Sequence, residues 1–253
     1  MTALITLLCG PRDNGAQAAS DMQLVLNHLS ESLSEILHEL DSLKTADDKK
    51  LRIYGPFLGR SWLEVAFTAL IGRLDPFRIL TIRRTQLSNG YDRTMPWKCA
   101  IRWQGDVLSS RPKDLWAASH EPKDLTRAVL GDYYDELYWR PALQALSDAV
   151  PMNHQSRWLT ELLGYPGESF SPRKRESVNS LYSELSKSVH FESVTPSAAL
   201  ADRISIVELI QRCVRETAEV ALLSHFVAHS FSNIDISSAV VHFASLEEME
   251  VVQ

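Results

Sequence analysis

The 253-residue sequence contains little glycine and cysteine, and it lacks the motifs of the common enzyme families. Only ten glycines are present, which argues against a turn-rich all-β fold and against a glycine loop that binds nucleotides. The three cysteines lie far apart and predict reduced thiols, not a disulfide framework. Without a nucleophile motif or a cluster of metal ligands, the sequence predicts no metal site and no bound cofactor.

Long apolar runs are also missing. The opening stretch Ala3–Cys9 is apolar but short, it has no basic residues before it, and polar residues follow it at once. It therefore predicts a buried first strand or half-helix, not a signal peptide. No segment approaches the roughly 18–20 apolar residues that a membrane span needs. We expect a cytoplasmic protein that does not enter a membrane.

Apolar residues recur at helical spacing over most of the chain. The pattern predicts helices over 17–43 and 60–74, and from residue 123 onward over 123–130, 132–150, 153–163, 172–190, 198–230 and 237–251. The stretch 198–230 is long and strongly apolar, as is typical of the central helix of a bundle. The predicted fold class is mainly α.

Three short segments fit a helix less well. Leu51–Tyr54 suits a short strand, and Trp97–Trp103 alternates as a strand does before a turn at 104–106. Phe77–Arg84 follows Asp75-Pro76, which is a helix-start signal, although its Ile and Thr residues also suit a strand. We therefore expect a helical bundle with a small β insertion near residues 97–108.

Two regions are predicted, which could form one continuous domain. Residues 1–120 form an N-terminal helical region with a basic, aromatic-rich insertion, and residues 121–253 form a C-terminal helical bundle. The excess of apolar helix after residue 198 also predicts self-association or assembly into a larger complex.

Charge is strongly segregated along the chain. Thirteen of the 26 Lys and Arg residues lie between Lys49 and Lys113, with only four acidic residues among them, so this window carries a net charge of about +9 while the whole chain carries −6. Aromatic residues are interleaved with the arginines, a pattern suited to phosphates and bases or to an acidic protein surface. The predicted contact residues are Arg60, Arg73, Arg78, Arg83, Arg84, Arg93 and Arg102. Alternatively, these arginines pair with the acidic helices of the same chain.

The segment Leu181–His190 places polar residues along one side of a helix. Asn179, Ser183, Ser186 and His190 lie within about 60° of one another at roughly 100° per residue. A histidine at a helix C-terminus interacts favourably with the helix dipole when protonated, which suits a proton shuttle or a phosphate contact. The alternative is a histidine that only caps the last carbonyls.

The sequence Leu-Tyr-Ser-Glu-Leu-Ser-Lys-Ser-Val-His, which precedes a long apolar helix, resembles the HEPN-like helical proteins of bacterial defence and abortive-infection systems. That resemblance implies a helical bundle that commonly forms dimers, and for many members a metal-independent ribonuclease with an Arg four to six residues before a His. His190 matches this His, but Ser183, Glu184 and Leu185 stand at the Arg positions. The resemblance spans under a fifth of the chain.

His225 and His229 have a spacing that can hold one metal ion, but no third ligand accompanies them, so they are interpreted as core or hydrogen-bonded histidines. The sequence therefore predicts an adaptor that binds nucleic acid or an acidic partner, as a homodimer or as a subunit of a larger complex. The alternative is a metal-independent endoribonuclease that uses His190.

Overall fold

The computed structural model describes residues 2–12, 20–92, 94, 101, 128–151, 154–189 and 202–249, apart from the side chains of 188 and 189. These residues are mainly helical and include no strand, so the predicted mainly α class is confirmed. The predicted β insertion near 97–108 lies outside the described residues except for Ile101. None of the described helices is long and apolar enough to cross a membrane.

The chain forms its helices in the following order. They are α1 (Thr2–Cys9), α2 (Asp21–Ser42), η1 (Leu43–Thr45), α3 (Asp48–Leu74), α4 (Pro76–Gln86), α5 (Asp132–Tyr134), η3 (Asp135–Trp139), α6 (Arg140–Ala149), α7 (Arg157–Leu163), η4 (Gly167–Ser169), α8 (Phe170–Val189), α9 (Arg203–Ser224), α10 (Ile236–Ser245) and η6 (Leu246–Glu248). The element η3 is a turn of π-helix between α5 and α6.

Short side chains cap the helices where the sequence offers them. Ser20 accepts a hydrogen bond from the backbone N–H of Gln23 at the start of α2, and Asp47 does the same for Lys50 at the start of α3. Asp75 accepts from the N–H of Arg78, with Pro76 as the first residue of α4. The helix-start signal at Asp75-Pro76 is therefore confirmed, and the stretch 77–84 is a helix and not a strand.

The predicted strand at Leu51–Tyr54 is wrong, because these residues belong to α3. Leu51 and Gly55 are buried while Ile53 and Tyr54 are exposed, a spacing that fits the 3.6-residue turn of a helix. The Asp47 cap starts the helix twelve residues before Arg60, the predicted start. It then continues through Gly55, Pro56 and Gly59.

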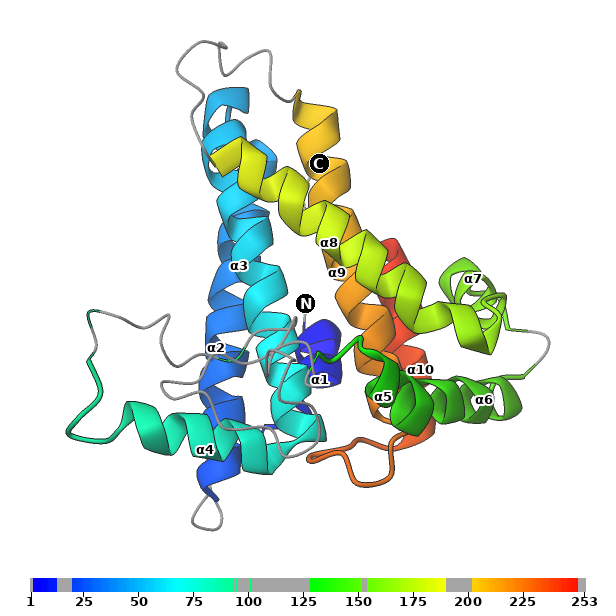
Figure 1. Cartoon of the computed structure of the whole chain (residues 1–253). Helices are drawn as coiled ribbons and strands as arrows, with labels where there is room; N and C mark the ends of the chain where they lie inside the picture. Colours follow the sequence, from blue (N-terminus) through cyan, green and yellow to red (C-terminus); the bar gives the residue numbers. More distant parts are fainter. Residues whose placement is uncertain are drawn as a thin grey trace.

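Helix α3 stands at the centre of the molecule, between α2 on one side and α8 and α9 on the other (Figure 1). Glycine allows close approach here: a Cβ at Gly55 would lie 2.9 Å from Cγ2 of Ile206 in α9. Deeper in the same interface, Nε1 of Trp62 donates to Oγ1 of Thr217 at 3.0 Å, so this buried polar pair is satisfied.

The main core draws on both halves of the sequence. It includes Leu63 and Phe67 of α3 together with Leu181 of α8 and Val214 of α9. The predicted division near residues 120 and 121 falls outside the described residues and stays a prediction.

Helix α9 ends at Ser224, earlier than the predicted Ser230. The chain turns there: the backbone N–H of Phe231 donates to the carbonyl of Arg73 at 2.7 Å, which fixes the loop against the end of α3. The apolar pattern continues past Ser224 because Val227 is buried in this loop, so periodicity alone could not locate the end of the helix.

Candidate functional site: the exposed face of helix α3

The basic window does not form one surface. Arg73 is fully buried at the end of α3, and all five of its N–H groups donate hydrogen bonds within the chain. The acceptors are the carbonyl oxygens of Leu7 and Phe231, Oγ of Ser224, Nδ1 of His225 and Oδ1 of Asn233, at 2.8 to 3.1 Å. Arg73 therefore ties α1, α3 and the loop after α9 together, and its predicted role as a contact residue is corrected to a structural one.

His225 belongs to the same buried cluster. Its Nδ1 accepts from Arg73, and its Nε2 lies 3.0 Å from the carbonyl oxygen of Leu7, so the neutral ring carries its proton on Nε2. Burial first, and then the charge of Arg73, lower the pKa of His225 to about 3. The interpretation of His225 as a satisfied core histidine is confirmed. A ring that stays neutral throughout the physiological range cannot act there as a general acid.

The other predicted contact arginines lie in different environments. Arg78, a residue of α4, is buried, so it too does not belong to the predicted contact surface. Arg83 is partly exposed on α4 and pairs with Asp21 of α2 at 2.7 Å, and Arg84 is exposed beside it. Arg93 and Arg102 lie outside the described residues.

Arg60 lies on an exposed face of α3 that combines cations with apolar side chains. We define the α3 face as the residues from Lys49 to Glu64 that share a sector of about 140° on the helix at 100° per residue. They are Lys49, Lys50, Ile53, Tyr54, Phe57, Arg60, Ser61 and Glu64. Tyr54 and Phe57 remain 53% and 55% exposed, which is unusual for aromatic side chains on a helix whose opposite side forms the core.

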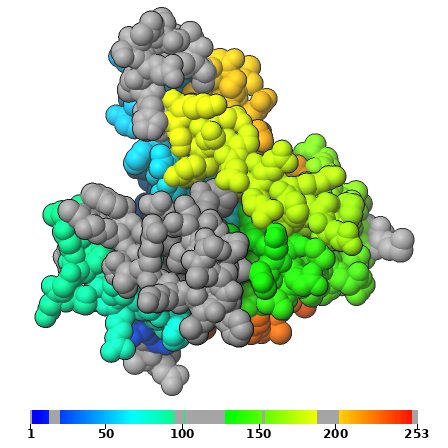
Figure 2. All heavy atoms as spheres, in the orientation of Figure 1, coloured from blue at the N-terminus to red at the C-terminus, as the bar shows by residue number. Residues whose placement is uncertain are grey.

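Helix α8 packs against α3, and the atoms of the two helices lie side by side in the space-filling view (Figure 2). The hydroxyl of Tyr182 donates to Oε1 of Glu64 at 2.9 Å, and the same oxygen accepts from Nε of Arg60 at 3.2 Å. The guanidinium of Arg60 also lies 4.7 Å from the centre of the Tyr182 ring. Burial, and then the hydrogen bond to Glu64, raise the pKa of Tyr182. The structure thus brings one arginine of the basic window onto the α8 segment singled out in the sequence.

His190 lies one residue beyond the end of α8 and outside the described residues. Val178, Leu181 and Leu185 are fully buried and form the core side of α8. Ser183 is exposed and Ser186 is partly exposed, in agreement with the predicted polar side.

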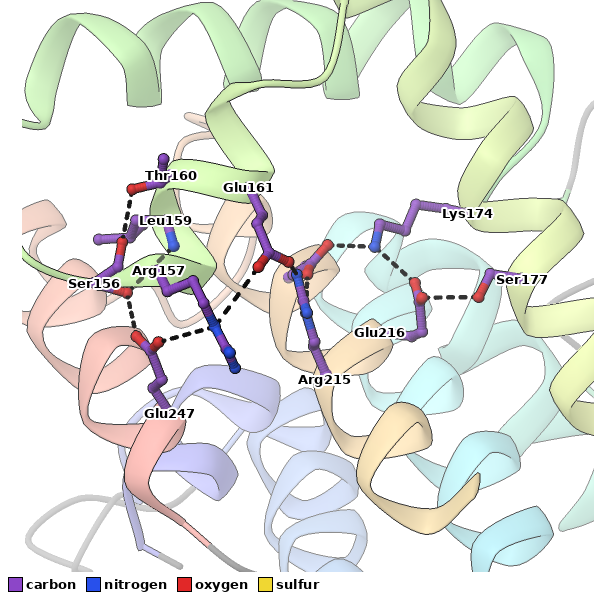
Figure 3. Close-up of polar contacts among 11 residues, drawn as sticks. Ser156, Arg157, Leu159, Thr160, Glu161, Lys174, Ser177, Arg215, Glu216 and Glu247 are labelled. Atoms are coloured by element: carbon purple, nitrogen blue, oxygen red, sulfur yellow. Dashed lines mark hydrogen bonds and ion pairs between the residues drawn. The ribbon is translucent and has the colours of Figure 1, made fainter. Parts of the chain in front are cut away.

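A second polar network joins α8 to α9 and α7 (Figure 3). Lys174 of α8 is buried and pairs with Glu216 at 2.6 Å and with Glu219, both of α9. Burial alone would lower the pKa of Lys174, but the two glutamates raise it, so the amine stays charged. Arg215 continues the network by pairing with Glu219.

The network then reaches the rim of the molecule. Arg215 also pairs with Glu161 of α7, and Arg157 bridges Glu161 to Glu247 of η6 at 3.6 and 3.5 Å (Figure 3). Alternating charges thus join α7, α8, α9 and η6. These acidic residues outside the basic window are therefore neutralised within the chain.

The described residues contain no group of three or more potential metal ligands. Cys9 and Cys213 are free and buried, and burial raises the pKa of each thiol to about 12, so neither is a thiolate nucleophile. Within the part of the chain that the structure describes, the strongest candidate for a functional site is therefore the α3 face, whose exposed cations and apolar side chains suit binding.

Comparison with known proteins adds no relative: no family model, no curated protein and no solved structure matches this chain. Sequence reasoning identified Arg60 but missed its pairing with Tyr182, because the two residues are far apart in the chain. The one signal present was the apolar set Ile53, Tyr54 and Phe57, which does not fit the buried side of α3.

Proposed function

We propose that this protein is a HEPN-like helical adaptor of a bacterial defence-type system. Its α3 face docks a segment of a partner protein that carries apolar and acidic residues side by side. The observation that carries the proposal is the exposure of Tyr54 and Phe57 between Lys49 and Lys50 at one end of the face and Arg60 at the other. Exposed aromatics beside cations are typical of the anchors of protein interfaces.

The composition of the face favours a protein over a nucleic acid. Lys49 and Lys50, which pair with no carboxylate among the described residues, and Arg60, which pairs with Glu64, would neutralise few phosphates. Affinity for nucleic acid depends on the number of phosphates neutralised. An acidic amphipathic segment needs only one or two cations to fix its register, while its apolar residues cover Ile53, Tyr54 and Phe57.

Co-expression with the product of each adjacent gene, followed by purification through a tag on this chain, tests the proposal. The variants are Tyr54→Ala with Phe57→Ala, and Lys49→Glu with Lys50→Glu. Loss of the two anchors or reversal of the two charges should weaken the complex at least about tenfold. Only the charge variant should also lose the salt sensitivity of the wild type.

Two exposed positions away from the α3 face provide controls, Val241→Ala on α10 and Arg173→Glu near the start of α8, where the guanidinium lies over the ring of Tyr165. Both should bind as the wild type does. If no adjacent product binds, or if the α3 variants bind as tightly as the controls, the adaptor proposal is wrong. Binding of single-stranded RNA through the same residues would reassign the face to nucleic acid.

The ribonuclease alternative predicts a different result. Labelled RNA incubated with the purified chain in EDTA should stay intact if the protein is an adaptor. Cleavage that His190→Ala lowers by roughly 10²–10⁴-fold would contradict the adaptor proposal and favour a metal-independent nuclease.

A further inference from the structure

A second hydrophobic cluster lies where α4 crosses α2, apart from the main core (Figure 1). Its buried members are Met22 and Leu26 of α2 and Ile79 of α4. Gly72 of α3 lies beneath it, since a Cβ there would be 2.8 Å from Cδ1 of Ile79. This small core is therefore a distinct unit that rests on α3.

A hollow of about 520 Å³ opens onto this cluster. Its walls are mostly aliphatic, from Leu24, Val25 and Leu29 of α2 and Ile79 and Ile82 of α4, with Ile101 beside them. Such a volume and lining are usual for sites that take a small molecule. Because aliphatic side chains predominate among the described lining residues, and no Phe, Tyr or Trp is among them, the walls suit a flexible alkyl chain better than a flat ring.

Polar groups of the same hollow come from α2, α3 and α4. They are His28, Thr68, Arg83 and Gln86. Nη1 of Arg83 donates to Oδ1 of Asp21 at 2.7 Å, and the side chain of Asp21 is 71% exposed. The other N–H groups of Arg83 can donate to a second acceptor, because a guanidinium has five donors and can bind two carboxylates at once.

We infer that this hollow binds a medium-chain alkyl carboxylate, with the chain against the aliphatic walls and the carboxylate on Arg83. The inference does not depend on the proposed function, because the hollow and the α3 face share no residue. Burial of the alkyl chain supplies most of the affinity, since each methylene removed from water contributes to it. Arg83 supplies the preference for an anion over a neutral head group.

Calorimetric titration of the purified full chain with decanoate and with decanol tests the inference. Decanoate should bind saturably, with about one molecule per chain. Leu24→Asp should abolish binding of both probes, because it places a charge against the alkyl chain. Leu24 is 47% exposed, so this change leaves the fold intact.

Two further variants separate the head group from the chain. Arg83→Gln should weaken the binding of decanoate at least about tenfold and leave the binding of decanol unchanged. The loss of the exposed ion pair with Asp21 should not unfold the protein. Leu87→Asp, at an exposed position outside the lining, should bind both probes as the wild type does.

Saturable binding that follows this pattern would establish the site. Binding of neither probe, or equal binding by wild type and Leu24→Asp, would overturn it. If Arg83→Gln weakens decanol as much as decanoate, the assignment of an anionic ligand is wrong. Association with phosphatidylglycerol vesicles in place of free decanoate would also overturn it.

Discussion

At the scale of single residues, the chain uses some of its most polar side chains to hold the fold. Arg73 donates to five acceptors and, among the described residues, has no carboxylate partner. A buried charge is retained only if its hydrogen bonds are satisfied, and the fixed guanidinium fork matches acceptors from α1, from the end of α9 and from the loop that follows it. Burial lowers the pKa of Arg73 to about 10, which still leaves it charged at neutral pH.

Arg73→Met should destabilise the protein by about 3–5 kcal/mol, because it leaves the carbonyl of Phe231 and the side chain of Asn233 without their donor. Urea unfolding at neutral pH measures this change in the free energy of unfolding. Arg84→Met, on the exposed side of α4, is the control and should stay within about 0.5 kcal/mol. Equal effects of the two substitutions would contradict the structural role of Arg73.

His225 should make stability depend on pH. Its pKa is about 3 in the folded protein and about 6.5 in the unfolded chain, so protons bind the unfolded state preferentially between these values. The stability that the neutral ring contributes is therefore complete above pH about 6.5 and is lost as the pH falls toward about 3. By pH about 5 the loss should reach about 2 kcal/mol.

Comparison with His225→Gln isolates this contribution from that of other groups. Wild type should be more stable than the variant at pH about 7, and the difference should shrink as the pH falls. A difference that stays constant from pH about 7 to pH about 5, in urea unfolding curves, would show that His225 does not titrate as inferred.

Residue roles of this kind could be predicted only in part. The lack of a third ligand beside His225 and His229 argued against a metal site, but nothing local in the sequence marks Arg73 as buried and Arg60 as exposed. Both arginines lie on α3, thirteen residues apart. Their fates differ because α1 and the loop after α9 cover one end of the helix, and this contact joins segments distant in the chain.

At the scale of elements, α3 combines two functions on opposite sides. Its buried side carries small residues that let α9 approach, and its exposed side carries the α3 face. On the other side of α9, the network of Lys174, Arg215 and their glutamates joins α8 to α9 and α7. The proposed partner contact and the stability of the fold thus depend on different sides of the central helices.

Lys174→Met should cost about 3–5 kcal/mol of unfolding free energy, because Glu219 is fully buried and would lose one of its two cations. Adding Glu219→Gln should recover part of the loss, since the uncompensated charge is then gone. Arg157→Met is the control and should cost less than about 1 kcal/mol, because that side chain is 71% exposed.

Urea unfolding of the wild type, of Lys174→Met, of Glu219→Gln and of the double variant gives the coupling between Lys174 and Glu219. If the double variant is no more stable than Lys174→Met alone, the network does not stabilise through this buried pair. An effect of Arg157→Met as large as that of Lys174→Met would likewise oppose this account.

The elements themselves were largely predictable where helical periodicity was long. Helices α2, α8 and α9 were anticipated, with ends that shifted by several residues. The strand expected at Leu51–Tyr54 was wrong because Gly55 and Pro56 suggest a break in the sequence, whereas tertiary contacts with α9 hold the helix through them. Packing against the rest of the protein decides the secondary structure of short segments whose residues have mixed helix and strand preferences.

At the scale of the whole molecule, the segregation of charge has a simpler meaning than one basic surface. Among the residues of the window that the structure describes, some are buried and some pair locally, and the α3 face and the exposed side of α4 are places where cations meet apolar side chains. The excess acidic charge elsewhere would repel an acidic partner from other surfaces and so favour these two. The fold class was predictable from the sequence, but the location of the binding face was not.

Site-specific photo-crosslinking tests the proposed docking of an acidic segment most directly. A photoreactive phenylalanine derivative replaces Phe57, or Val241 as the control, in cells that normally make the protein, and mass spectrometry then identifies the linked peptide. We predict a discrete protein cross-link at position 57, to a segment that contains both acidic and apolar residues, and none at position 241. Cross-links only to nucleic acid, or the same products at both positions, would contradict the account.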